Sequence, residues 1–284
     1  MAVRIEGIHR PGNHCGSTSL RTLSTHYGWD FDEPTCFGLA AGLGFAYFEL
    51  PITPHRGFFG RPLWLETAFF ENLGIAIDHR EGDSWDEAWD HIRSEIDANN
   101  PVMVFADIYY LDYYGSDTHF SPHSLLCIGY EDDRAILADS EFETPQSLPL
   151  DRLHEAMTSA HVMPIDNRHL VVTDPSMTIP YEEAALEAIT ETASYMLEPT
   201  STSRSLGPGT HGIQGIRRFA EDLPDWPSVE DPFWTVRFAY QNIERRGTGG
   251  GAFRRMYAAF LEKRGRAHRS SAGIGGNRDG SRRR

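Results

Sequence analysis

The sequence lacks a long apolar run, and it contains few cysteines and almost no lysine. A helix that spans a bilayer needs about 18 or more consecutive apolar residues, and the N-terminal segment also lacks the apolar stretch of a signal peptide. The three cysteines, Cys15, Cys36 and Cys127, form no C-x-x-C pair, which argues against a disulfide framework and a structural zinc site. We therefore expect a cytoplasmic protein with no membrane partner, no metal and no cofactor.

Acidic side chains outnumber basic ones by 41 to 26, so the net charge is -15, and Lys263 is the single lysine. This balance argues against nucleic acid as a partner, because phosphate binding needs a basic face. An acidic surface with little lysine is typical of a salt-rich cytosol, where ions screen the repulsion between like charges. We expect a halophilic or high-GC source.

The 284 residues, 40% of them apolar, are enough for about two domains. A helical period runs through 15–27, where Leu20, Leu23 and Tyr27 share one face, and Gly28 ends it. Apolar strands are predicted at 101–108 and 168–174, with a hairpin between 123 and 139. After residue 175 the patterns are helical, at 181–197, 213–223, 232–245 and 251–264. These patterns predict an α+β domain over 1–175, a helical domain over 176–265 and a disordered basic tail over 266–284.

Three residues stand where a nucleophilic site needs them. Cys15 opens a helix, whose unpaired N–H groups and dipole favour the thiolate and can hold an oxyanion. His123 begins the first strand of the hairpin and Asp139 ends the second, so the two ends lie side by side. The carboxylate can then orient the imidazole that accepts the thiol proton. We interpret this as the layout of a papain-like catalytic site.

At these residues the sequence resembles a known family. The segments HCGSTSLRTLSTHYG, CFGLAAGLGFAYF and ADIYYLDYYGSDTHFSPHSLLCIGYEDDRAILAD are similar to the N-terminal domain of butirosin biosynthesis protein H. The later GGGAFRRMYAAFLEK is similar to the helical domain that follows it in many relatives. The resemblance implies a papain-like fold and an acyltransferase that moves an aminoacyl group from a carrier-protein thioester to an amine.

A more distant resemblance, to the papain-like peptidases of bacteriocin exporters, bears on the oxyanion hole. Those peptidases have a glutamine six residues before the nucleophile, where this chain has His9. His9, Asn13, His14 or backbone N–H groups remain candidates for the missing donor.

The loop 109–120 is rich in tyrosine and aspartate, and packing is the alternative to a binding role. Tyr110, Tyr114, Asp107 and His119 are the candidates for binding a polar or cationic acceptor. The expected partners are a thioester donor, which an acyl carrier protein can present, and a small amine; the helical region is a candidate homodimer surface.

Three functions stay open from the sequence. The first is the cysteine-dependent acyltransferase, and the second is a cysteine amidase or peptidase on the same fold. The third is a binding module without activity, which the change from glutamine to His9 permits.

Overall fold

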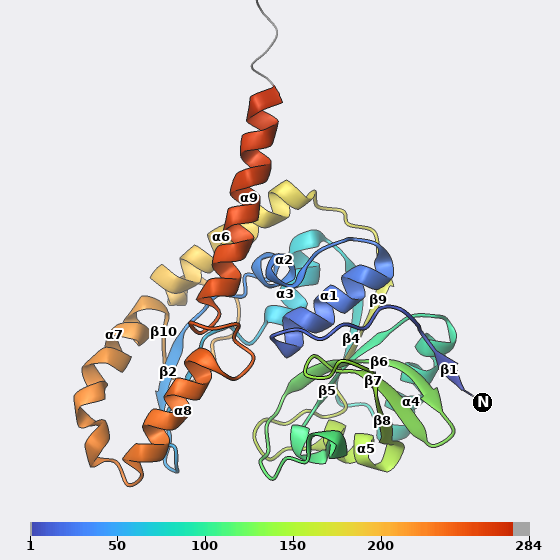
Figure 1. Cartoon of the computed structure of the whole chain (residues 1–284), viewed down its shortest axis with the longest axis horizontal. Coiled ribbons are helices and arrows are strands. Elements are labelled where there is room, and N and C mark those ends of the chain that lie inside the picture. The colour runs from blue at the N-terminus through green and yellow to red at the C-terminus, as the bar shows by residue number, and fades with distance from the viewer. Residues whose placement is uncertain (1, 275–284) are drawn as a thin grey trace, which may run out of the picture.

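A computed structural model describes residues 2–274 of the chain (Figure 1). The fold is α+β, as the sequence predicted, with a large antiparallel sheet, a small second sheet and helices around both. The strands are β1 (Val3–Arg4), β2 (Ala46–Glu49), β3 (Arg56–Phe59), β4 (Ala76–Arg80), β5 (Val102–Ala106), β6 (His123–Glu131), β7 (Arg134–Ala138), β8 (Gln146–Pro149), β9 (His169–Asp174) and β10 (Thr210–His211). The α-helices are α1 (Cys15–Tyr27), α2 (Glu33–Leu39), α3 (Leu65–Leu73), α4 (Trp85–Asp97), α5 (Leu150–Thr158), α6 (Tyr181–Leu197), α7 (Gly212–Asp222), α8 (Pro232–Glu244) and α9 (Arg254–Ile274).

The large sheet has the strand order β4-β9-β5-β6-β7-β8, and β1 pairs with β6. Strands β6 and β7 form the predicted hairpin, which turns between Glu131 and Arg134, where Asp132 has a φ of 50°. Because β6 begins at His123 and β7 ends at Ala138, the hairpin brings His123 and Asp139 to the same edge of the sheet.

Helix α1 packs on β6 and lies above the sheet in the view of Figure 1, with α5 below it. Its apolar face is buried through Leu20 and Leu23, as the helical period predicts. The helix ends at Gly28, which takes the left-handed conformation (φ 73°) and donates its N–H to the Ser24 carbonyl. Helix α1 is thereby held on the strand that begins at His123.

The small sheet, in the order β10-β2-β3, has a core of its own with α7 and α8. Figure 1 places α7 and α8 beside β2, on the other side of the molecule from α4 and α5. Tyr47, Phe58 and Trp226 are buried in this second core. The sequence did not predict β2 or β3, because these strands are short and follow a glycine-rich segment.

Helices α6 and α9 share the main core with the large sheet, through Ala184, Met256 and Phe260. Gly38 of α2 permits the close approach of α9, since a Cβ at this position would lie 2.1 Å from the Phe260 ring. The predicted boundary near residue 176 falls between β9 and α6 and stays a prediction.

The segment predicted to be disordered begins at residue 266, and α9 runs through its first part to Ile274. Its remainder, 275–284, lies outside the described residues. Among residues 2–274, no helix is both long and apolar enough to cross a bilayer.

Candidate active site

Cys15 is the first residue of α1 and is half-buried. The residue before it, His14, is extended (φ -127°, ψ 132°) and caps the helix with its side chain, because Nδ1 accepts the Ser17 N–H at 3.2 Å. The other ring nitrogen, Nε2, lies 3.8 Å from Cys15 Sγ. The helix cap therefore also places an imidazole against the thiol.

Glu33, the first residue of α2, holds the turn that leads into Cys15. Its carboxylate accepts the backbone N–H groups of Asn13 at 3.0 Å and His14 at 2.8 Å, and the Asn13 side-chain amide at 3.1 Å. The hydroxyls of Ser17 and Thr18 also donate to it. Charge-assisted hydrogen bonds of this kind are stronger than neutral ones, so this buried carboxylate fixes the backbone on both sides of the helix start.

Helix α9 supports the same turn from the far end of the chain. The Phe253 ring, one residue before α9, stacks on Phe37 and meets His14 edge-on, with ring centroids 5.2 Å and 5.0 Å apart. Within α9, Met256 Sδ lies 3.7 Å from the Ser17 hydroxyl. Residues more than 200 positions later in the sequence thus pack against the cap of α1.

His123 is buried at the start of β6, between Cys15 and Asp139. Its Nε2 lies 3.0 Å from Asp139 Oδ2, and its ring is close enough to Cys15 to lower the pKa of that thiol. Because Nε2 is engaged by the carboxylate, Nδ1 is the ring nitrogen left to take the thiol proton. The structure brings together the three residues that the sequence placed in one site.

Asp139 is fully buried and is saturated by neutral donors as well as by His123. Tyr113 donates to Oδ2 at 3.0 Å and Tyr114 to Oδ1 at 2.9 Å. Both tyrosines come from the 3-10 turn Asp112–Tyr114. Tyr114 was a predicted substrate-binding residue, and its hydroxyl is instead committed to this carboxylate.

The charges of these groups stabilise one another. Burial raises the pKa of Cys15, but the neighbouring imidazoles of His14 and His123 outweigh burial, so the pKa lies well below its usual value. Burial lowers the pKa of His123, but the Asp139 charge and hydrogen bond and the Cys15 sulfur raise it to about 10. At neutral pH these opposite shifts favour a thiolate–imidazolium pair.

The other two thiols differ from Cys15. Cys36 and Cys127 are fully buried among apolar side chains, and burial raises the pKa of both, that of Cys127 to about 12. They are therefore protonated and inert at neutral pH.

The remaining predicted residues do not contact the thiol. His9 donates from Nε2 to the Phe142 carbonyl at 2.8 Å, so it holds the loop after Asp139. Asp107 is fully buried and accepts His119 Nδ1 at 2.8 Å and the Ser159 hydroxyl at 2.7 Å, which leaves no free carboxylate for an amine.

His119 stacks on Tyr109 and His161, and the Tyr110 hydroxyl lies 3.4 Å from His161 Nε2. Within the part of the chain that the structure describes, no group of three or more His, Cys, Asp or Glu residues is placed to hold a metal ion.

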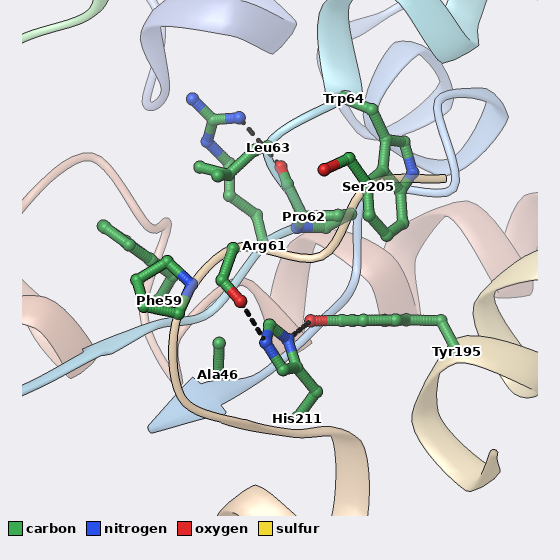
Figure 2. A pocket seen from close by; sticks show the side chains of 11 residues that line it. Ala46, Phe59, Arg61, Pro62, Leu63, Trp64, Tyr195, Ser205 and His211 are labelled. Atoms are coloured by element: carbon green, nitrogen blue, oxygen red, sulfur yellow. Dashed lines mark hydrogen bonds between the residues drawn. The ribbon is translucent and has the colours of Figure 1, made fainter. Parts of the chain in front are cut away.

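A pocket beside the small sheet lies outside this site (Figure 2). It is lined by Trp64, by Tyr195 of α6 and by His211, whose Nδ1 accepts the Tyr195 hydroxyl at 2.9 Å. Arg61 lines the same pocket, and Figure 2 shows its guanidinium extending away from Tyr195 and His211. Cys15 does not line this pocket.

Comparison with known proteins gives two family matches. Residues 14–140 match the N-terminal domain of butirosin biosynthesis protein H, and residues 151–272 match a domain of unknown function, DUF4872. The first match contains Cys15, His123 and Asp139. No curated protein matches the chain.

Two solved structures are similar to the chain. One is a C39-like peptidase from Bacillus anthracis, with 14% identity over 62% of this chain and 99% of that one, and a TM-score of 0.44. The other is the peptidase domain of Streptococcus ComA, a bifunctional ABC transporter involved in a quorum sensing pathway, with 12% identity over 58% and 96% and a TM-score of 0.38.

A helix with cysteine at its N-terminus, packed on an antiparallel sheet that carries histidine and aspartate on neighbouring strands, is the papain-like arrangement. The family match and this arrangement support a papain-like cysteine enzyme. Residues 14–140 belong to the butirosin biosynthesis protein H N-terminal family, and the chain carries this domain fused to a domain of unknown function.

Proposed function

We propose that the protein is a cysteine acyltransferase, which moves an acyl or aminoacyl group from a thioester to an amine through an acyl-enzyme on Cys15. The observation that carries the proposal is the place of His123, whose Nε2 lies 3.0 Å from Asp139 and whose ring lowers the pKa of the Cys15 thiol. We choose a carrier-protein thioester as the donor because the resemblance to the family implies this reaction for its namesake.

In the first half-reaction the Cys15 thiolate attacks the thioester carbonyl carbon, and the carbonyl π electrons move to oxygen. The tetrahedral intermediate then breaks its bond to the donor sulfur. The leaving thiolate takes the proton from the His123 imidazolium, and the acyl group stays on Cys15.

In the second half-reaction an amine attacks the acyl-enzyme carbonyl and gives its proton to His123 Nδ1. Collapse of the second intermediate breaks the carbon–sulfur bond, releases the amide and restores the thiolate–imidazolium pair. Asp139 keeps the ring in orientation and stabilises its charge in both halves.

The donors for the oxyanion follow from the hydrogen bonds of the turn. The backbone N–H groups of Asn13 and His14 are committed to Glu33, and His9 donates to Phe142. The His14 ring remains, because Nδ1 accepts the Ser17 N–H and the proton is therefore on Nε2, on the side of Cys15 Sγ. We assign the oxyanion to His14 Nε2–H and the Cys15 N–H, one of the first N–H groups of α1.

The test is to trap the acyl-enzyme. The full chain is incubated with an acyl thioester of N-acetylcysteamine, and intact-protein mass spectrometry with peptide mapping locates the acyl group. We expect one acyl group on Cys15 in the wild type and in Cys127→Ala, and none in Cys15→Ala.

Addition of a small primary amine should then release an amide faster than water releases the acid. Absence of a Cys15 adduct refutes the proposal. An adduct that only water resolves selects the hydrolase, that is, the amidase or peptidase.

A further inference from the structure

The chain between α8 and α9 has an uncommon backbone. Ala252 and Phe253 take the left-handed conformation, with φ values of 47° and 70°, directly after three glycines (249–251) that also have positive φ. Glycine adopts this conformation freely, whereas a Cβ makes it unfavourable, most of all in a bulky residue. Backbone strain of this kind persists only where the surrounding structure holds it, and it clusters at functional sites. Two strained residues in succession therefore point to a contact that the strain maintains.

The same segment lies against the turn that leads into Cys15. A Cβ on Gly247 would lie 2.7 Å from the Asn13 carbonyl oxygen, and the φ of 65° at this position also favours glycine. At the other end of the segment, Phe253 is 6% exposed, and its carbonyl accepts the Tyr257 N–H at 3.0 Å in the first turn of α9. Helix α9 thus anchors the strained residue whose ring reaches the turn before the nucleophile.

The ring that this backbone carries packs on His14. Phe253 meets the imidazole edge-on, with an interplanar angle of 85° and centroids 5.0 Å apart, and Phe37 does so from farther away, at 6.3 Å. Edge-to-face pairs at this spacing are favourable and directional. The hydrogen bond from the Ser17 N–H to Nδ1 leaves Nε2 for Cys15 Sγ. The nitrogen that faces the thiol is therefore set by Ser17, and the nearest ring against the imidazole is that of Phe253.

We infer that Phe253 is a positioning residue, whose ring holds the His14 imidazole with Nε2–H toward the thiol and the oxyanion. The strained backbone at Ala252 and Phe253 is the means by which the ring reaches this place. Phe253 lies in the region 151–272 that matches a domain of unknown function, so the role of that domain in this chain is to complete the active site of the preceding one. The inference rests on the proposed function, in which His14 donates to the oxyanion.

Two measurements on the full chain test this role. The first is the pH dependence of Cys15 alkylation by iodoacetamide, followed by peptide mass spectrometry. Burial raises the pKa of Cys15, and the His14 imidazole is the strongest of the influences that lower it, so Phe253→Ala should raise the midpoint of the pH profile by about one unit. Phe58→Ala is the matched control, because Phe58 is also buried and stacks on Phe45 at 5.3 Å, but in the second core. This control should lower the melting temperature and leave the midpoint unchanged.

The second measurement is the rate constant for acylation of Cys15 by an acyl thioester of N-acetylcysteamine. Loss of one oxyanion donor costs about 100- to 1000-fold in rate. Phe253→Ala displaces the donor without removing it, so we expect the rate constant to fall by about 10- to 100-fold. Because the effect passes through His14, Phe253→Ala should cause no further fall in a His14→Ala background.

The inference is overturned if Phe253→Ala leaves the alkylation midpoint unchanged, or if it slows acylation by the same factor with and without His14; the acyltransferase proposal then stands. If the wild type is not acylated at all, that proposal fails, and the shift of the alkylation midpoint still decides the role of Phe253. If circular dichroism shows that Phe253→Ala is unfolded, Phe253→Leu, which keeps the bulk but not the ring, takes its place with an expected shift in the same direction.

Discussion

The two tyrosines on Asp139 allow a test of how the carboxylate is held. Oδ1 accepts the Tyr114 hydroxyl at 2.9 Å and, at 3.4 Å, the Glu141 N–H. Tyr114→Phe therefore leaves this buried oxygen with the long bond alone. Loss of a hydrogen bond to a charged group costs about 1.5–3 kcal/mol, so the free energy of unfolding should fall by about this amount at pH 7.

The stability that Tyr114→Phe loses depends on pH, because it depends on the charge of Asp139. Burial raises the pKa of Asp139, but the charge and hydrogen bond of His123 and the two tyrosine hydroxyls outweigh it, so the pKa lies below its usual value. A depressed pKa contributes stability that is present above the unfolded value, near 3.8, and is lost as the pH falls below it. The difference in the free energy of unfolding between wild type and Tyr114→Phe should thus be constant from pH 7 to pH 5 and shrink below about pH 4.

Urea denaturation, followed by tryptophan fluorescence at several pH values, measures the free energy of unfolding and its change with pH. Tyr109→Phe is the matched control, because its ring stacks on His119 and no partner of its hydroxyl is found among the described residues. A free energy of unfolding of Tyr114→Phe within about 0.5 kcal/mol of the wild-type value, a change typical of surface substitutions, would refute this role of Tyr114. A loss of stability in Tyr109→Phe as large as that in Tyr114→Phe would refute it equally.

Three further predictions concern the thiol. Iodoacetamide should alkylate Cys15 at pH 6 at least about tenfold faster than the two buried thiols, and His123→Ala should remove most of this difference in rate. Peptide mass spectrometry measures the rates, and equal rates for the three thiols count against the thiolate–imidazolium pair of Cys15 and His123. Glu33→Gln should slow alkylation of Cys15 because a neutral amide holds the turn less strongly, and an unchanged rate contradicts its anchoring role. Gly16→Ala should lower the melting temperature, because the added Cβ would lie 2.5 Å from Glu66 Oε1 and displace this side chain. A melting temperature equal to that of the wild type shows that the contact between Gly16 and Glu66 is not tight.

Much of the site was predictable because its signals are local. The apolar period and Gly28 defined the ends of α1, and the turn at Asp132 defined a hairpin whose length fixes which strand ends meet. Placing Cys15, His123 and Asp139 together needed only these two local structures and the packing of one on the other.

The supporting residues were missed because their roles depend on contacts between distant segments. Glu33 lies in a short helix whose capping signal, Asp32 followed by Pro34, marks the helix start but not the contacts of Glu33 with the turn before Cys15. The spacing along the chain gives no sign that Glu66 and Ser124 meet, since their hydrogen bond joins the start of α3 to β6 only in the folded protein. Similarly, nothing local distinguishes a tyrosine that supports a carboxylate from one that binds a substrate.

The packing of Phe253 and Met256 on the cap of α1 has a consequence for the order in which the protein matures. The ribosome synthesises the nucleophile more than 200 residues before the side chains that pack against its helix cap. A nascent chain therefore exposes Cys15 long before its surroundings are complete, and full reactivity arises only after α9 has been synthesised. Deletion of α9 should for the same reason lower the reactivity of Cys15, although the two are far apart in the sequence.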